Sequence, residues 1–314
     1  MLFRFLSPLA VCFAPATRAF WRANRESGAS VPAALHGYIY ARWPRLYIGM
    51  LMGRLPLARP FVRLEKLLRR LGLVTDAHYA AFAQGYHAKV LQPGAAPGLL
   101  KIERPIAMYL PEKVLPYSRA RQLILEVGER LAVIECPCRA SRNSSCGPRD
   151  VCIIVGNTVA DFVLAAHKDK ARSLTPEEAI RIVERENRRG RVSHAFFKDA
   201  VLDRFFCICN CCSCCCAAIE SHKNGTPTLV SSGFVADLDA LRCEKCGLCA
   251  RRCPFDAVST LPGGPVVDEA RCMGCGICSL ICPAKAMRLD IAPQRPAPLP
   301  LASNVAGECR VKRH

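Results

Sequence analysis

The sequence has 314 residues, of which 51% are hydrophobic and 22% are charged, and its formal net charge at pH 7 is +18. This length and hydrophobic fraction exclude an intrinsically disordered chain and are typical of a folded protein of about two domains. Disulfide frameworks occur mainly in small secreted domains, and this chain is not small. Its 21 cysteines therefore predict thiols in a reducing compartment, the cytoplasm.

The positive charge is concentrated in the first quarter of the chain. Residues 1–75 contain twelve arginines and lysines but only two acidic residues, and aromatic side chains stand among the basic ones. Aromatic rings beside arginines favour a lipid interface over a DNA groove, and no zinc finger, RNA-binding signature or basic zipper accompanies them. We therefore expect residues 1–75 to bind an anionic surface, at the inner face of the membrane or on a protein partner. We do not expect a nucleic-acid partner.

The first residues resemble a targeting segment only superficially. The run from Phe5 to Thr17 is uncharged, but it is shorter than the roughly 20 apolar residues that a membrane-spanning helix needs. Pro8 interrupts the run and only Arg4 precedes it. We therefore do not expect an export signal.

A basic amphipathic helix is predicted between Pro60 and Gly72, because apolar residues recur there at helical spacing with basic residues between them. The apolar residues are Phe61, Leu64, Leu67, Leu68 and Leu71, and the basic ones are Arg63, Lys66, Arg69 and Arg70. Such a helix either packs its apolar face on the core or docks on a membrane or a partner. The sequence leaves both alternatives open.

Further elements are predicted between this helix and the first cysteines. In chain order they are a helix over residues 75–89, a linker over 93–98, a helix that starts near Ser118 with Leu123, Val127 and Leu131 on one face, and a strand over 133–135. The helices follow from apolar residues at helical spacing, and the linker follows from its prolines and glycines.

Strands and one well-capped helix are predicted between the two cysteine groups of the middle region. Apolar runs predict strands over residues 151–155 and 191–197. Thr175 and Glu178 form a capping box with proline at the first helical position, so a helix should begin there and end near Arg189. Another helical piece is expected before the second cysteine group.

Eleven cysteines of the middle region form two dense groups. The first comprises Cys136, Cys138, Cys146 and Cys152, and the second comprises Cys207, Cys209, Cys211, Cys212, Cys214, Cys215 and Cys216. Thiolates this close repel one another and oxidise unless a metal holds them, so an iron–sulfur centre is predicted, with zinc as the alternative. The first group has a long loop and the second is crowded, so neither makes a good cage alone. We therefore predict one additional centre whose ligands come from both groups.

The C-terminal region contains one cysteine pattern twice. The pattern Cys243-x2-Cys246-x2-Cys249-x3-Cys253-Pro254 is repeated 29 residues further on, from Cys272 to Pro283. Three thiolates on one tight loop bind three irons of a cube, and the fourth iron needs a sulfur from elsewhere. Zinc ribbons use two cysteine pairs for each metal, so they do not match these triplets.

This pattern resembles the bacterial two-[4Fe–4S] ferredoxin domain over residues 235–290. The resemblance implies that each run completes the cluster of the other. It assigns Cys243, Cys246, Cys249 and Cys282 to one cluster, and Cys272, Cys275, Cys278 and Cys253 to the second. More widely, residues 130–290 resemble uncharacterised iron–sulfur proteins that join the element Ile-Cys-Asn-Cys-Cys-x-Cys-Cys-Cys, here residues 208–216, to such a domain.

These observations together predict an α+β protein with four regions. They are a basic, mainly helical region at 1–92, a Cys-rich α/β region with a further metal centre at 99–234, the ferredoxin domain at 235–290, and a Pro-rich basic tail at 291–314. The expected cofactors are two [4Fe–4S] clusters and one further iron–sulfur cluster.

The predicted function is single-electron transfer between the two ferredoxin clusters and the additional centre. One alternative is a reductase with its active site at Cys136–Cys152 and Cys207–Cys216, and the other is a non-catalytic subunit of a redox complex. The sequence contains neither G-x-G-x-x-G nor a P-loop. We therefore expect electrons to arrive from a redox protein partner rather than from a bound nucleotide.

Overall fold

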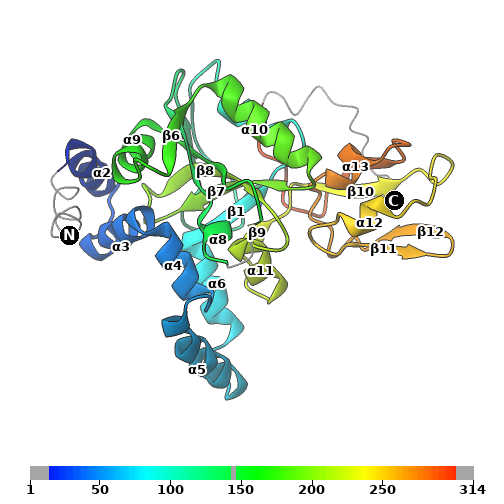
Figure 1. Ribbon diagram of the computed structural model, residues 1–314, viewed down its shortest axis with the longest axis horizontal. Coiled ribbons are helices and arrows are strands. Elements are labelled where there is room, and N and C mark those ends of the chain that lie inside the picture. Colours follow the sequence, from blue (N-terminus) through cyan, green and yellow to red (C-terminus); the bar gives the residue numbers. More distant parts are fainter. Residues whose placement is uncertain (1–13, 143–145, 302–314) are drawn as a thin grey trace.

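The structure is a computed structural model that describes residues 14–142 and 146–301 (Figure 1). Most of the uncharged N-terminal run lies within residues 1–13, and the end of the basic tail lies within residues 302–314, outside the described residues. Helices and strands are mixed along the chain, which confirms the α+β class. None of the described helices is long and apolar enough to cross a membrane.

Helices make up the chain from residue 15 to residue 85. They are α2 (Pro15–Glu26), α3 (Val31–Arg42), α4 (Pro44–Leu51), the 3-10 helix η2 (Pro56–Ala58), α5 (Arg59–Arg70) and α6 (Asp76–Gly85). Phe20 of α2 is fully buried and stacks on Phe162 of α9 (Asn157–Ala166), with ring centroids 4.7 Å apart. The first helices therefore belong to the body of the protein.

Helix α5 instead extends away from the rest of the molecule (Figure 1). None of its residues is buried, and Phe61, Leu64 and Leu67 are each more than half exposed. The sequence predicted the position of this helix correctly. The alternative in which its apolar face packs on the core is wrong, because those side chains remain in solvent.

A nine-stranded mixed sheet forms the centre of the molecule. Its strands are β1 (Tyr86–Val90), β2 (Ile106–Tyr109), β3 (Gln122–Leu125), β4 (Leu131–Glu135), β5 (Asp150–Val155), β6 (Ala171–Leu174), β7 (Val192–Lys198), β8 (Arg204–Cys211) and β9 (Leu229–Val230). The main order is β6-β4-β5-β8-β7-β1-β9, and the β2–β3 pair joins through β8. Strand β1 belongs to this sheet, so the sheet extends across the boundary expected at residue 92.

Two predictions made for residues 75–98 are wrong. The helix expected over 75–89 ends at Gly85, because the next residues pair with β7 as strand β1. The linker expected over 93–98 is helix α7 (Ala95–Leu100), whose apolar residues are buried under the sheet. In both places tertiary packing outweighs the local sequence pattern.

Two other expected helices are strands or turns. The helix expected from Ser118 is replaced by β3 and β4, since Leu123 and Leu131 pack into one apolar core from neighbouring parts of the sheet. The helical piece expected before the second cysteine group is a turn over residues 199–203 followed by β8. The second cysteine group therefore begins on a strand at the centre of the sheet.

The predictions for the rest of the middle region are confirmed. Strands β4, β5 and β7 occupy the expected segments, and α10 (Pro176–Arg188) has the predicted capping box. Thr175 Oγ1 accepts a hydrogen bond from Glu178 N at 3.2 Å, and Glu178 Oε2 accepts one from Thr175 N at 3.0 Å. The short helices α8 (Pro137–Ala140) and α11 (Ala217–Lys223) complete this region.

The sheet separates two apolar cores, and strand residues alternate between them. On β5, Cys152 belongs to one core and Ile153 to the other. On β8, Cys207 and Cys211 belong to the first core, Cys209 packs against it, and Ile208 belongs to the second. Because successive side chains of a strand point to opposite faces, the alternating cysteines of β8 form one row.

The C-terminal region forms a small lobe at one end of the molecule (Figure 1). It contains the antiparallel pairs β10 (Phe234–Leu238) with β13 (Met287–Ile291) and β11 (Val258–Leu261) with β12 (Gly264–Val267), and helices α12 (Leu248–Arg251) and α13 (Ile277–Ile281). The described part of the tail returns to the sheet, where Leu299 is buried in the second core. There Lys89 Nζ donates a hydrogen bond to the carbonyl of Ala297 at 2.7 Å.

Candidate metal centres

The first cysteine run of the C-terminal lobe surrounds a cavity. Cys243 and Cys246 lie on the loop that enters α12, Cys249 lies in the first turn of α12, and Cys282 follows α13. All four line one cavity. The loop enters α12 through Gly247, whose φ of 67° is a left-handed conformation that glycine adopts without strain.

The second run surrounds a matching cavity. Cys272 and Cys275 lie on the loop that enters α13, Cys278 lies in the first turn of α13, and Cys253 follows α12. These four line a second cavity. The structure therefore groups each run with the last cysteine of the other, in the crossed arrangement that the ferredoxin resemblance implies, although their roles as ligands remain predictions.

Backbone amides point at several of these sulfur atoms. The N–H of Ala257 donates to Cys253 Sγ and that of Ala286 donates to Cys282 Sγ, each at 3.3 Å, in equivalent places of the two runs. Such hydrogen bonds stabilise negative charge on a coordinated thiolate and tune the reduction potential of a bound cluster. The donors and the two four-cysteine cavities therefore fit [4Fe–4S] clusters.

Burial disfavours ionisation of these thiols on their own. Desolvation raises the pKa of Cys278 to about 12, raises that of Cys275 well above the usual thiol value, and raises that of Cys249. A positively charged metal centre reverses this effect, because metal-bound thiols are deprotonated. These sites are therefore built for metal-bound thiolates rather than for free ones.

In the middle region, an inner cavity collects cysteines from both groups of the sequence. Cys136 and Cys138 flank the start of α8, Cys152 lies on β5, and Cys209, Cys211 and Cys216 lie on or after β8. All six line one cavity, together with Tyr40 and Tyr86. Cys212 and Cys215 also contribute to its wall. We call this space, with its six cysteines, the inner cavity.

Strand pairing explains why distant cysteines meet there. Cys152 on β5 is the register partner of Cys209 on β8, and their Sγ atoms are 3.5 Å apart. Cys207, two residues before Cys209 on the same face, has its Sγ 3.4 Å from that of Cys209. Cys207 does not line the cavity.

One thiol of the inner cavity ionises more easily than its neighbours. The thiols of Cys136 and Cys216 donate hydrogen bonds to Cys138, which together hold its pKa well below the usual value. The N–H of Ala217 also donates to Cys138 Sγ, at 3.5 Å. Arg54 adds a positive charge nearby and donates to the Cys138 carbonyl at 3.1 Å. The surroundings of Cys138 therefore favour the thiolate, which is the form that binds a metal.

A buried histidine lies beside this cavity without a hydrogen-bond partner. His194 of β7 is fully buried, and burial lowers its pKa to about 3. Neither ring nitrogen has a partner among the described residues. One of its nitrogens and the Sγ atoms of Cys211 and Cys216 all lie within 4.8 Å of one another. Its ring also meets the ring of Phe255 edge-on, with an interplanar angle of 66° and centroids 6.4 Å apart.

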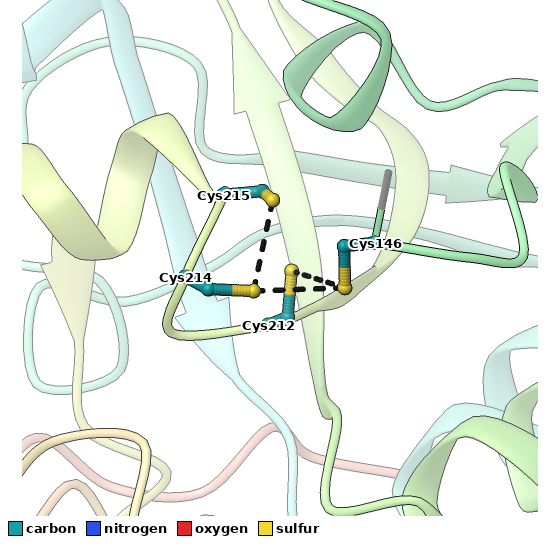
Figure 2. A group of neighbouring side chains, drawn as sticks. All are labelled: Cys146, Cys212, Cys214 and Cys215. Carbon is teal, nitrogen blue, oxygen red and sulfur yellow. Dashed lines mark hydrogen bonds between the residues drawn. The ribbon is translucent and has the colours of Figure 1, made fainter. Parts of the chain in front are cut away.

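Four further cysteines form a separate outer group, shown in Figure 2, which consists of Cys146, Cys212, Cys214 and Cys215. Their Sγ atoms all lie within 4.8 Å of one another. Cys146 comes from the loop after α8, and the other three come from the turn after β8. The outer group therefore also joins the two cysteine groups of the sequence.

Positive charge surrounds the outer group. Arg191 Nη2 donates to Cys146 Sγ at 3.2 Å. Burial opposes ionisation of Cys212, but a hydrogen bond with Cys214 and the positive charge of Arg139 outweigh it, so its pKa is lowered. Arg139 is itself buried and paired with Glu186 at 3.1 Å.

The structure thus places ten of the eleven middle cysteines in two adjoining sets rather than around one point, and the eleventh, Cys207, lies next to Cys209. All of the described cysteines are free, and the ligand roles predicted for them remain predictions. The sequence analysis did not identify His194 or Phe255 as site residues. His194 lies on a strand and Phe255 follows a cysteine run, so no sequence motif distinguishes either residue. It also missed Arg54, whose only signal was its place in a basic region.

Comparison with known families identifies the C-terminal lobe. Residues 236–259 and 265–288 each match the model of the 4Fe-4S binding domain, and each match contains all four cysteines of one run. The lobe is therefore a ferredoxin-type domain that binds 4Fe-4S clusters, of the kind with two cysteine runs. The matches cover only this part of the chain, and no curated protein matches the sequence.

Proposed function

We propose that this chain is an electron-transfer protein that connects a redox partner with a metal centre in the inner cavity. A bound [4Fe–4S] cluster accepts and releases single electrons, and the protein around it sets its potential. The observation that supports the proposal is the contact between Phe255 and His194, because these two rings lie between a ferredoxin cavity and the inner cavity.

The contact joins the two sites through packed side chains. Phe255 lines the second ferredoxin cavity, and its ring lies 6.4 Å from that of His194. His194 in turn lies within 4.8 Å of two sulfur atoms of the inner cavity. An ion pair between Lys223 of α11 and Asp256, at 2.5 Å, holds the same loop against the middle region. The second ferredoxin site is therefore the one next to the inner cavity.

The first ferredoxin site is the one that faces solvent. Cys246 is exposed, whereas Cys272 and Cys275 of the second site are buried. Arg242, Lys245 and Arg251 are exposed around the first site. Electrostatic complementarity favours fast association of oppositely charged surfaces, so we propose a redox protein partner with an acidic docking surface at this site.

Iron content tests the proposed inner centre. Anaerobically reconstituted full-length protein should contain clearly more than the roughly eight irons that two [4Fe–4S] clusters account for. Cys138→Ser or Cys211→Ser should remove the excess iron and leave the electron paramagnetic resonance (EPR) signals of the ferredoxin clusters unchanged. Ser213→Ala, at an exposed position of the same turn, is the control. A wild-type iron content that stays near eight would contradict the proposal.

We further propose that α5 binds an anionic membrane surface. The support is that its apolar side chains are exposed while basic side chains such as Arg63, Lys66 and Arg70 lie on the same projecting helix. A helix with an exposed apolar face and a basic polar face is suited to the lipid interface. Such binding would hold the electron-transfer protein at the inner face of a membrane.

A further inference from the structure

The outer group has the sulfur spacing of a single-ion site. In a four-cysteine zinc site, tetrahedral bonds of about 2.3 Å place neighbouring sulfur atoms roughly 3.8 Å apart. The Sγ atom of Cys146 lies 3.7 Å from that of Cys212 and 3.5 Å from that of Cys214, and Cys214 and Cys215 are 3.6 Å apart (Figure 2). These distances are close to the spacing that one tetrahedral ion requires.

The ferredoxin cysteines of the same molecule provide an internal comparison. In a [4Fe–4S] site each thiolate binds a different iron, so the sulfur atoms stand farther apart than around one ion. Among the described residues, no ferredoxin cysteine belongs to a set of three or more possible ligands within 4.8 Å of one another, whereas the outer group does. The outer group therefore has a smaller sulfur spacing than the ferredoxin sites.

The local charges also suit this kind of site. Four thiolates with one divalent ion carry a net charge of about −2, which needs compensation in a partly buried place. Arg191 donates to Cys146 Sγ at 3.2 Å, and the charge of buried Arg139 acts on Cys212. Two cations thus face the outer group.

We propose that the outer group binds one zinc ion through Cys146, Cys212, Cys214 and Cys215, separately from the centre in the inner cavity. A four-thiolate zinc site leaves no open position and is structural. The ion joins the loop after α8 to the turn after β8. It thereby fixes neighbouring Cys216, which lines the inner cavity. This site does not depend on the electron-transfer proposal, because zinc and iron are measured independently.

Metal analysis of the full-length protein, purified anaerobically with zinc and iron in the medium, tests the assignment. About one zinc per chain is expected, with an X-ray absorption spectrum at the zinc edge that shows four sulfur neighbours at about 2.3 Å. Cys214→Ser and, separately, Cys146→Ser should each remove the zinc. Ser213→Ala should retain it, and Cys246→Ser in the ferredoxin domain should lose iron but keep the zinc.

Three results would overturn the proposal. They are a wild-type protein without zinc, a zinc content that both cysteine variants leave unchanged, and a loss of iron instead of zinc in those variants. The last result would assign the outer group to an iron centre. If Cys214→Ser protein does not fold, Cys146→Ser decides the question, because Cys146 lies on a surface loop and is not part of either apolar core.

Discussion

Arg139 connects three elements around the cysteine sites through a single buried side chain. Its guanidinium donates to Glu186 of α10 at 3.1 Å, to the carbonyl of Asn210 on β8 at 2.9 Å, and to the carbonyl of Pro148. Arg139 and Glu186 have side chains that are 1% and 0% exposed. Glu186 Oε1 also pairs with Arg189 at 3.1 Å, but removing Arg139 leaves Glu186 Oε2 and the carbonyl of Asn210 without their buried donor. Such a loss is more costly than losing an exposed ion pair.

Arg139→Met should therefore lower the free energy of unfolding by about 3 kcal/mol. Arg188→Met is the matched control, because Arg188 pairs with Glu184 in solvent at 3.8 Å and such pairs contribute less than about 1 kcal/mol. Anaerobic urea denaturation measures both changes. Equal losses in the two variants would show that the buried pair has no special role.

The buried side chain of His87 makes the free energy of unfolding depend on pH. It is fully buried between Tyr117 and Phe197, and burial lowers its pKa to about 4 from the usual value of 6.5. The unfolded chain therefore binds more protons than the folded one between these values, so stability should fall as pH drops from about 6.5 to about 4.

Replacing His87 should remove this contribution. Relative to the wild type, His87→Gln should gain stability by about 3 kcal/mol as pH falls from 6.5 to 4. His78→Gln, at an exposed histidine, is the control. Anaerobic urea denaturation at several pH values measures the difference, and parallel curves for the wild type and His87→Gln would disprove this assignment.

At the scale of elements, the cysteine run at 207–216 carries the pattern of a strand as well as that of a metal site. Cys207, Cys209 and Cys211 alternate with other residues, and this two-residue period is that of a strand. The sequence predicted a helical piece before them because local pattern was weighed without the sheet. Only the pairing of β8 with β5 and β7 brings Cys152 and His194 to the same row, and pairing between distant strands is not encoded locally.

The crossed grouping of the ferredoxin cysteines predicts paired mutant phenotypes. Cys253→Ser should give the iron loss and EPR changes of Cys275→Ser, because both residues line the second cavity. It should differ from Cys246→Ser, although Cys253 is nearer to Cys246 in sequence. If Cys253→Ser instead reproduces the Cys246→Ser spectrum, each run completes its own cluster and the crossed arrangement is wrong.

The exposed helix α5 predicts salt-dependent membrane binding. Each basic residue near an anionic membrane contributes on the order of 1 kcal/mol, and salt screens the attraction. Full-length protein should sediment with anionic but not neutral vesicles, and Arg63→Glu with Lys66→Glu should release it. Arg181→Glu, exposed on α10, is the control. Binding that ignores lipid charge and salt would contradict this proposal.

At the scale of the whole molecule, the sequence predicted the ferredoxin domain well because its ligands lie in one short, regular pattern. It predicted that the two middle cysteine groups would meet, but not that they would divide into an inner cavity and an outer group. That division depends on which side of β8 and its following turn each thiol occupies. The position of the ferredoxin lobe against the sheet also depends on long-range contacts, such as that of Phe255 with His194, which have no local signature.

This arrangement predicts a direction of electron flow. The first ferredoxin site faces solvent through Cys246, and the second meets the middle region through Phe255. Electrons from a partner should therefore reach the inner cavity after the ferredoxin clusters. A substitution at the contact should slow this last transfer and leave metal content unchanged.

Rapid-freeze EPR of the reduction of full-length protein, with Phe255→Leu beside the wild type, tests this account most directly. In the wild type, the ferredoxin signals should appear first and the signal of the inner centre should follow. In Phe255→Leu the second phase should be slower at the same iron content, whereas Phe205→Leu, at a buried phenylalanine of the other core, should retain the wild-type rate. A protein whose only iron signals are those of the ferredoxin clusters, or an inner signal that Phe255→Leu does not delay, would contradict the account.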